Sequence, residues 1–398
     1  MRVVIIGSGG REHAICLALK KSKNISKIYC IPGNAGTSSI SENVDIDIDN
    51  FDKLAKFILN NKIDTVIVGP EKPLVDGIED FLKKKKINVF GPNKIASQLE
   101  GSKIFTKEIC KKYNIPTANF GVFKNFENSV SFLEGCSHPI VVKADGLAAG
   151  KGVYICENKD KSTSAVKEIF GGKFGKANRV LIEEFLEGEE MSFFIISDGK
   201  SYKKFGTAQD HKRVLEGDRG KNTGGMGAYS PSRLENEKLD EKILEKIIKP
   251  TLKGLNELKT SFCGFLYAGL MIVKGEPFLI EYNVRMGDPE CQTILPRLKT
   301  DFGTIIDACI KKKLDLINLE WDNQKSLCIV LCAKGYPDEY KKNIQIKNLE
   351  KMILDSNEYI FHAGTKKSNS IILSNGGRVL NFVIKSNDFK SGRNKIIK

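Results

Sequence analysis

The chain has 398 residues, of which 41% are hydrophobic and 28% are charged, and this balance is typical of a globular protein with a sizeable core. No apolar run approaches the roughly 20 residues that span a bilayer, and the run after Met1 is too short for a signal peptide, so we expect a cytoplasmic protein without a membrane partner. The net charge of +14 comes from dispersed lysines, and the ten cysteines are scattered, which argues against a nucleic-acid partner, a disulfide framework and a zinc site.

The first hundred residues alternate short apolar runs with helical patterns. Strands are predicted at residues 3–6, 28–31, 65–68 and 88–90, and helices at residues 12–21, 51–60 and 75–86. This alternation predicts an α/β fold with a parallel, doubly wound sheet. The loops at the carboxyl ends of its strands should face a ligand.

A glycine-rich turn at residues 7–13 follows the first predicted strand. Glycines let the backbone approach a phosphate, and the following helix N-terminus supplies N–H donors. A dinucleotide fingerprint does not fit, because Glu12 stands at the third glycine position and the second strand ends without an acidic residue. A phosphosugar therefore fits better than NAD. The turns at 32–37 and 69–71 close the next two strands and would help to build the same pocket.

A connecting helix is predicted over residues 100–113, and a compact α/β segment follows it at about 115–190. In this segment a strand ends in Lys143 and runs into a small-residue loop at 144–153. A lysine beside flexible backbone is what a mobile lid over nucleotide phosphates needs, although the loop is not a Walker loop.

A second strand of this segment, at 180–186, is followed by an acidic turn at 187–190. The pair could seat adenine and ribose, and an exposed acidic turn is the alternative interpretation. Further on, residues 217–229 are predicted as a long glycine-rich loop, a kind of segment that is usually functional or disordered. A helix is predicted over 238–257.

The stretch from 278 to 290 begins as the second strand of a hairpin whose turn is predicted at 274–277, and it ends as a loop. Glu281 and Asn283 are two positions apart, so their side chains leave the same face of the strand. A carboxylate and an amide oxygen suit Mg²⁺, whose other ligands would be phosphate oxygens and water. Arg285 adds a planar fork for phosphate or carboxylate. Alone, such a short motif also fits a polar strand end capped by a turn.

The remaining residues, from 326 onward, read as short strands of an antiparallel sheet. His138 and His362 are expected to be structural, whereas His13 and His211 lie in candidate ligand loops and stay open. No Ser-His-Asp or Cys-His arrangement is evident, so a covalent protein nucleophile is not indicated.

Taken together, these motifs resemble the phosphoribosylamine–glycine ligases (glycinamide ribonucleotide synthetases), ATP-grasp enzymes of purine biosynthesis. The resemblance runs from Val3 to the last residue. It is carried by residues 7–13, 32–37, 69–71, 143–152, 209–213, 222–231, 267–270 and 287–290. Lys221 stands where the family commonly has proline, which leaves the rigidity of that loop open.

The resemblance implies an ATP-grasp architecture in three domains. These are an N-terminal doubly wound parallel-sheet domain at 1–102, a central ATP-grasp domain at 103–325 with a mobile lid at about 115–190, and a small, mainly antiparallel C-terminal domain at 326–398. Residues 389–398 match the start of the family's last helix, so we expect the C-terminal domain to lack its last segment.

The resemblance also implies the reaction. ATP would phosphorylate the carboxylate of glycine, and the amine of 5-phosphoribosylamine would attack the glycyl phosphate, giving glycinamide ribonucleotide, ADP and phosphate. Such chemistry needs charge neutralisation and positioning rather than a protein nucleophile. The implied cosubstrate is ATP, the implied ion is Mg²⁺ or Mn²⁺, and we expect a monomer that acts on these small molecules only.

By the same resemblance, each ligand is given its residues. The ATP site would comprise Lys103, Lys143, Glu183, Glu184, Phe185, Leu186, Glu190, Arg213 and Asn222. The phosphoribosylamine site would comprise Gly9, Gly10, Arg11, Glu12, Gly33, Asn34, Ala35, Gly36 and Thr37. The metal would lie on Glu281 and Asn283, and the catalytic contacts to glycine and the acyl phosphate would come from Asp210, Arg285 and Asp288.

Three other interpretations compete with this one. Another ATP-grasp carboxylate–amine ligase would keep Lys143 and the metal pair but lack the turns at 7–13 and 32–37, whose presence argues against it. A basic nucleic-acid-binding protein would cluster its cations with exposed aromatic residues, and the lysines are dispersed. A catalytically inactive family member that only binds nucleotide stays open, because the family's last segment is missing.

Overall fold

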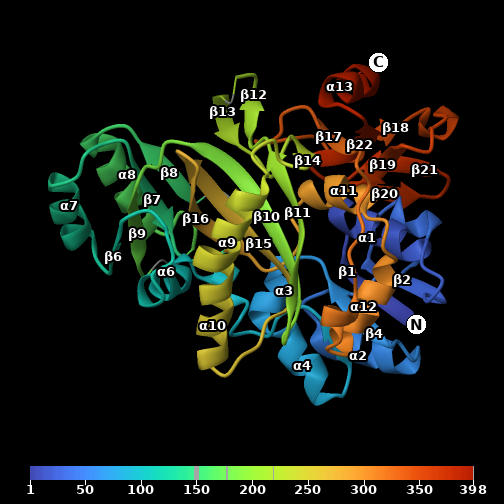
Figure 1. Cartoon of the computed structure of the whole chain (residues 1–398). Coiled ribbons are helices and arrows are strands. Elements are labelled where there is room, and N and C mark those ends of the chain that lie inside the picture. The colour runs from blue at the N-terminus through green and yellow to red at the C-terminus, as the bar shows by residue number, and fades with distance from the viewer. Residues whose placement is uncertain (148–151, 176–177, 218, 398) are drawn as a thin grey trace.

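The computed structural model describes residues 1–147, 152–175, 178–217 and 219–397. Figure 1 shows a large curved sheet in the middle, with a small α/β unit on one side of it and the N-terminal and C-terminal units on the other. Within the described ranges every helix is too short or too polar to cross a membrane.

The N-terminal unit is the predicted parallel sheet. Its strands lie in the order β3-β2-β1-β4-β5, and all of its pairings are parallel. The strands are β1 (Arg2–Gly7), β2 (Lys27–Pro32), β3 (Glu42–Asn43), β4 (Thr65–Val68) and β5 (Asn88–Phe90). The helices are α1 (Gly10–Lys20), α2 (Phe51–Asn60), α3 (Glu71–Asp76) and α4 (Ile78–Lys84). The two-residue strand β3 was not predicted, because it is too short to show a strand period.

Two helices that were predicted as continuous are each divided into two. The helix expected over 75–86 is divided into α3 and α4 at Gly77, whose φ of 98° ends a right-handed helix. The helix expected over 100–113 is divided into α5 (Gln98–Gly101) and α6 (Lys103–Lys112). The break falls at Ser102, whose hydroxyl accepts the N–H of Phe105 at 3.1 Å and so caps α6.

A small α/β unit falls within the stretch expected to form the lid. Its antiparallel sheet has the order β6-β9-β7-β8, and α7 and α8 pack on it around a separate hydrophobic core. The elements are β6 (Phe120–Phe123), α7 (Phe126–Glu134), β7 (Ile140–Ala144), β8 (Val153–Cys156), α8 (Lys159–Phe170) and β9 (Val180–Glu184). Residues 148–151 of the predicted small-residue loop lie outside the described residues.

The large sheet has eight strands in the order β16-β15-β10-β11-β14-β17-β22-β19. They are β10 (Glu189–Asp198), β11 (Tyr202–Asp210), β14 (Gly227–Ser230), β15 (Cys263–Val273), β16 (Glu276–Asn283), β17 (Lys325–Cys332), β19 (Glu358–His362) and β22 (Arg378–Ser386). Because β14 pairs with β17, one sheet continues across the boundary expected at residue 325. The C-terminal strands are therefore joined to the central strands by main-chain hydrogen bonds.

Two turns differ from the sequence prediction. The stretch at 217–229, expected as a loop, contains part of a hairpin of β12 (Arg213–Leu215) and β13 (Arg219–Asn222). The turn between β15 and β16 is only Lys274-Gly275, both with positive φ, as a tight two-residue hairpin requires.

The remaining elements cover the large sheet and extend the C-terminal unit. The helix expected over 238–257 is continuous but contains a π turn at Leu244–Ile248 between α9 (Glu237–Ile243) and α10 (Lys249–Glu257). The other helices and strands are α11 (Glu290–Ile294), α12 (Phe302–Ile310), β18 (Gln345–Ile346), β20 (Thr365–Ser368), β21 (Ile371–Ser374) and α13 (Phe389–Ile397). Short 3₁₀ turns lie at Thr37–Ser39, Leu295–Arg297, Leu314–Leu316 and Leu349–Lys351.

Two extended hydrophobic clusters each contain residues of both the N-terminal sheet and the large sheet. In one of them Ile6 and Val66 belong to the same cluster as Phe193 and Leu266. Burying apolar surface across this seam holds the carboxyl edge of the parallel sheet against the end of β16. A cavity lies at this junction.

Candidate active site

A cavity of about 790 Å³ lies between the N-terminal sheet, the lid unit and the end of β16. Eleven of the side chains or backbone positions predicted for the site line it: Gly9, Arg11, Glu12, Lys103, Lys143, Glu183, Asp210, Glu281, Asn283, Arg285 and Asp288. The other predicted residues do not line it: Gly10, Gly33, Asn34, Ala35, Gly36, Thr37, Glu184, Phe185, Leu186, Glu190, Arg213 and Asn222. Their assignments stay predictions.

The predicted metal pair is on the cavity side of β16. Glu281 lies opposite Gly269 of β15, and a Cβ at Gly269 would come within 3.3 Å of the Glu281 side chain, so the glycine makes room for it. Among the described residues Glu281 accepts no hydrogen bond and forms no ion pair, while Asn283 Oδ1 accepts from Arg285 Nη2 at 3.1 Å. A carboxylate without a protein partner beside an amide oxygen fits a hard divalent cation.

The described residues hold no group of three or more His, Cys, Asp or Glu side chains arranged around a metal position. An ion on Glu281 and Asn283 would therefore take most of its ligands from phosphate oxygens and water. This coordination is usual for Mg²⁺ at nucleotide sites.

A buried ionic triad lies at the lid side of the cavity. The Glu183 carboxylate is 2.7 Å from Lys143 Nζ and 2.9 Å from Lys107 Nζ, and all three side chains are buried. Burial opposes ionisation of Glu183, but the two ammonium groups outweigh it and hold the pKa of Glu183 below its usual value. The triad keeps one net positive charge beside the cavity, which suits a phosphate group.

The triad changes how Glu183 is interpreted. Each of its oxygens already forms an ion pair with a lysine. Adenine or ribose would therefore have to compete with Lys107 and Lys143 for this carboxylate. Lys107 was not predicted, although it lies one helical turn after Lys103 on α6, and this i, i+4 spacing could have found it. Burial lowers the pKa of Lys103, whose Nζ donates to the carbonyl of Gly146 at 2.9 Å.

The other residues predicted for ATP lie in contacts of their own. Glu184 accepts from the backbone and side-chain amides of Asn119, each at 3.0 Å. The Lys212 ammonium is 2.9 Å from Glu190 and holds the pKa of Glu190 below its usual value. Arg213 and Asn222 are partners in the β12–β13 hairpin. Thr223 and Gly224, directly after that hairpin, line the cavity.

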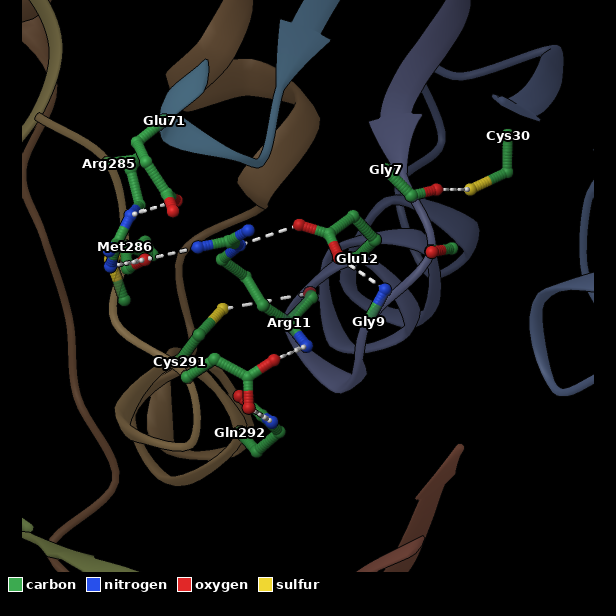
Figure 2. Close-up of polar contacts among 12 residues, drawn as sticks. Gly7, Gly9, Arg11, Glu12, Cys30, Glu71, Arg285, Met286, Cys291 and Gln292 are labelled. Carbon is green, nitrogen blue, oxygen red and sulfur yellow. Dashed lines mark hydrogen bonds and ion pairs between the residues drawn. The ribbon is translucent and has the colours of Figure 1, made fainter. Parts of the chain in front are cut away.

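Arg285 is held by two carboxylates. Its Nε lies 3.2 Å from Glu71 and its Nη2 lies 2.7 Å from Glu100. Figure 2 shows the contact with Glu71. Burial raises the pKa of Glu100 to about 7 even though Arg285 opposes this shift. Neither carboxylate was assigned a role from the sequence. Glu71 belongs to a turn that was singled out, whereas Glu100 gave no signal.

Two backbone N–H groups of the glycine-rich turn already donate to carboxylates of the chain itself. The N–H of Gly9 donates to Glu12, and the N–H of Arg11 donates to Asp288 at 3.2 Å. The Arg11 guanidinium donates to the Glu12 carboxylate at 2.6 Å and to the carbonyl of Met286 at 3.1 Å, and Figure 2 shows it between these two partners. A phosphate at this turn would therefore rely on the remaining backbone donors and on the arginine side chain.

The turn at 33–37 lies behind this loop rather than in the cavity wall. The side-chain amide of Asn34 donates to the carbonyls of Ser8 at 2.9 Å and His362 at 2.8 Å. Its oxygen accepts the N–H groups of Gly36 and Thr37 at 2.8 and 3.0 Å. Asn34 thus ties the glycine-rich turn to the C-terminal unit and shapes the site from outside.

His13 is structural. Its Nδ1 accepts the N–H of His362 at 2.9 Å, so it joins α1 to β19. Burial, and then the neighbouring His362, lower the pKa of His13 to about 3, and burial lowers that of His362 to about 4. Both rings are therefore neutral at physiological pH.

Asp210 faces the cavity together with a second carboxyl, Glu290, that was not predicted individually. Burial is the main cause that raises the pKa of Asp210. Burial, followed by the Asp210 charge, raises the pKa of Glu290 to about 7. A carboxyl that titrates near neutrality can take up or release a proton during a reaction.

The Asp288 carboxylate is not free, because it has several partners within the chain. Besides the Arg11 N–H, it accepts from Gln292 at 2.8 Å and lies 3.3 Å from the Arg378 guanidinium. Arg378 also donates to the carbonyl of Gly224. The C-terminal unit therefore contributes an arginine to the cavity wall, which no local sequence signal indicated.

Family models match nearly the whole chain. The N domain of phosphoribosylglycinamide synthetase matches residues 1–100, its ATP-grasp (A) domain matches 101–291, and its C domain matches 326–398. The expected α/β fold with ATP-grasp architecture is confirmed by these matches together with the observed sheets.

Curated relatives and a solved structure agree. The phosphoribosylamine–glycine ligase of Brucella melitensis is 46% identical over 382 residues, covering 96% of this chain and 90% of the relative. That of Caldanaerobacter subterraneus is 43% identical over 398 residues, covering 99% and 94%. The crystal structure of phosphoribosylamine–glycine ligase from Thermotoga maritima superposes with a TM-score of 0.85 at 34% identity, covering 100% of this chain and 95% of that one. The chain therefore belongs to the phosphoribosylglycinamide synthetase family.

Proposed function

We propose that the chain is an ATP-dependent ligase that joins glycine to 5-phosphoribosylamine in the 790 Å³ cavity. The observation that carries this proposal is the meeting, in one cavity, of three sets of groups. They are the buried lysines of the nucleotide side, the Glu281–Asn283 pair, and the glycine-rich turn of the N-terminal sheet. The relatives' names supply the substrates.

In the first step a glycine carboxylate oxygen attacks the γ-phosphorus of ATP, the bond from that phosphorus to the β-phosphate oxygen breaks, and ADP leaves. The product is glycyl phosphate. In the second step the amine of phosphoribosylamine attacks the acyl carbon, the bond from this carbon to the phosphate oxygen breaks, and inorganic phosphate leaves. The proton lost by the nitrogen needs an acceptor, and Glu290 is suited to that role because its pKa is raised to about 7.

The chain's own residues supply positioning and charge. Lys103 and Lys143 neutralise phosphate charge, and the Lys107–Glu183 contact keeps Lys143 in place. The one Nη1 hydrogen of Arg285 that has no acceptor among the described residues receives the carboxylate of glycine or the acyl phosphate. Asp210, beside Glu290, holds the glycine ammonium by charge. A divalent ion on Glu281 and Asn283 would neutralise the ATP phosphates and lower the cost of the attack by an anion.

The N-terminal turn holds the sugar phosphate. The Arg11 side chain and the backbone N–H of Gly10, which has no acceptor among the described residues, would bind phosphoribosylamine once Glu12 has taken the N–H of Gly9, and residues 33–37 support that turn from behind. The ion is Mg²⁺ or Mn²⁺. The protein works as a monomer in the cytoplasm on small molecules, without nucleic acid or membrane.

The test is the release of ADP with ATP and Mg²⁺, supplying glycine and freshly prepared phosphoribosylamine together and then each alone. Turnover that needs both substrates is the expected result, and formation of glycinamide ribonucleotide is followed by mass spectrometry. A chain that releases ADP only with another pair of carboxylate and amine substrates would be a different ATP-grasp ligase. A chain that binds ATP but turns over no pair would be an inactive member of the family.

A further inference from the structure

Glu100 reaches two consecutive residues at the end of β16. One carboxylate oxygen accepts from Arg285 Nη2 at 2.7 Å, and the other accepts the backbone N–H of Val284 at 2.8 Å. Val284 directly follows Asn283, so this grip holds the strand end that presents the Glu281–Asn283 pair. A buried carboxylate with two partners of this kind fixes both a backbone segment and a side chain.

The Arg285 guanidinium has five N–H groups. Its Nε donates to Glu71 at 3.2 Å, its Nη1 to the carbonyl of Met286 at 3.2 Å, and its Nη2 to Glu100 and Asn283. One Nη1 hydrogen therefore has no acceptor among the described residues. The four contacts set the direction in which that last donor points.

Of the two carboxylates on Arg285, Glu100 gives the firmer support. Its side chain is 8% exposed, whereas that of Glu71 is 33% exposed, and its contact is shorter by 0.5 Å (3.2 against 2.7 Å). Water competes for the Glu71 contact more than for the Glu100 contact. Removal of Glu100 should therefore disturb Arg285 more than removal of Glu71.

The same segment also holds the loop that follows β7. Ser102 donates to the carboxylate of Asp145 at 3.0 Å, and Lys103 donates to the carbonyl of Gly146 at 2.9 Å. Residues 100–103 thus lie between the end of β16 and the nucleotide side of the cavity. A displacement of Glu100 would therefore move both the end of β16 and the residues on the nucleotide side of the cavity.

We propose that Glu100 is a positioning residue of the ligase, which acts through Arg285 to hold the guanidinium where the acyl group is phosphorylated. This inference rests on the proposed function for its kinetic readout. Its structural claim, that Arg285 depends on Glu100 for its orientation, does not.

A merely structural role predicts something different. The charged groups around Glu100 are Arg285, Glu71 and Arg11, with Lys103 nearby on α6. Burial disfavours the ionised carboxylate in the fold despite Arg285, so a neutral glutamine at this position should not lower thermal stability at pH 8. Loss of activity without loss of stability would separate positioning from packing.

The experiment is a double-mutant cycle with Glu100→Gln, Arg285→Ala and the two combined, with Glu100→Asp as the conservative variant. Glu127→Gln, an exposed change on α7, is the matched control. Since a misplacement of about 1 Å can cost roughly 100-fold in rate, we expect Glu100→Gln to lower kcat by roughly 30- to 100-fold. The KM for ATP should change little, and Glu100→Asp should recover part of the rate.

The double-mutant cycle tests whether the effect of Glu100→Gln on kcat depends on Arg285. In the Arg285→Ala background, Glu100→Gln should lower kcat by less than about 2-fold, because the residue through which it acts is gone. An undiminished penalty in that background would overturn the inference, as would a kcat for Glu100→Gln within about 2-fold of the wild type. A parallel loss of melting temperature and activity would also overturn it.

A wild type without turnover would contradict the proposed function rather than this inference. In that case crystal structures of the wild type and of Glu100→Gln decide the structural claim. The inference expects the guanidinium of Arg285 to leave its place between residues 71 and 100 in the variant. An unmoved guanidinium would contradict it.

Discussion

Arg11 and Arg285 donate hydrogen bonds to the same carbonyl oxygen, that of Met286, at 3.1 and 3.2 Å. Arg11 comes from the first helix and Arg285 from the end of β16, so one backbone oxygen joins the N-terminal sheet to the central strands (Figure 2). The two like charges can lie close together because each has a carboxylate of its own, Glu12 for Arg11 and Glu100 for Arg285. The two halves of the proposed reaction meet at this carbonyl.

Replacement of Arg11 by lysine should weaken the phosphoribosylamine half of the site. A lysine has a single ammonium group and cannot contact Glu12 and Met286 with the fixed geometry of a guanidinium. Loss of one charged hydrogen bond corresponds to roughly 10-fold or more in affinity. We therefore expect the KM for phosphoribosylamine to rise by about that factor while the KM for ATP is unchanged. Initial rates measure both, with the exposed Arg393→Lys as control, and a rise in the KM for ATP alone would contradict the assignment.

Glu281→Gln should change the metal requirement more than the fold. Glu281 has no protein partner among the described residues, so removing its charge breaks no internal contact. Oxygen ligands without charge bind Mg²⁺ weakly, and we expect the Mg²⁺ concentration for half-maximal ADP release to rise roughly 10-fold or more. Melting temperature without Mg²⁺ should be unchanged or higher. An unaltered Mg²⁺ dependence would place the ion elsewhere.

Lys107→Met should destabilise the lid unit. Glu183 would keep Lys143 but lose its second buried partner, and breaking a buried ion pair costs about 3 kcal/mol or more. Urea unfolding measures this loss. The double variant Lys107→Met with Glu183→Gln should lose less stability than Lys107→Met alone, because the uncompensated carboxylate is then absent. Equal losses in the single and double variants would show that the triad is not electrostatically coupled.

His13 should make the fold sensitive to acid. Its pKa is lowered from 6.5 to about 3, so the unfolded chain binds a proton that the folded chain does not. The contribution of neutral His13 to the free energy of unfolding is therefore fully present above pH 6.5 and is lost as the pH falls towards 3. At pH 4 the loss from this residue is on the order of 3 kcal/mol.

The variant His13→Asn tests this sign. Its side-chain oxygen can still accept the N–H of His362 but does not titrate. We expect the free energy of unfolding to fall less steeply between pH 6.5 and pH 4 in the variant than in the wild type. Glu100 and Glu290, whose raised pKa values act in the opposite direction, are common to both proteins and cancel in the comparison. Parallel pH profiles would contradict a neutral, buried His13.

Much of the molecule was determined by local pattern. The parallel strands at the start of the chain are short apolar runs separated by helices, and a pattern of that kind has few other packings. Glu281 and Asn283 face one cavity because a strand alternates its side chains with a period of two. The glycine-rich turn was found for a similar reason, since Gly7 has a φ of 125° and a Cβ there would meet Glu12, only five residues further on.

The contacts that complete the site were decided only by the tertiary structure. Glu183 meets Lys107, Arg285 meets Glu100, and Asp288 meets Arg378 because the sheets and helices bring distant segments together. No periodicity joins such positions, and the balance between burial and neighbouring charges sets whether a carboxylate is charged, as in Glu183, or titrates near neutrality, as in Glu100. The residues at 33–37 show the converse. Their turn chemistry was evident in the sequence, but the side of the loop on which they lie, behind Gly9 rather than in the cavity, depends on how the C-terminal unit packs against it.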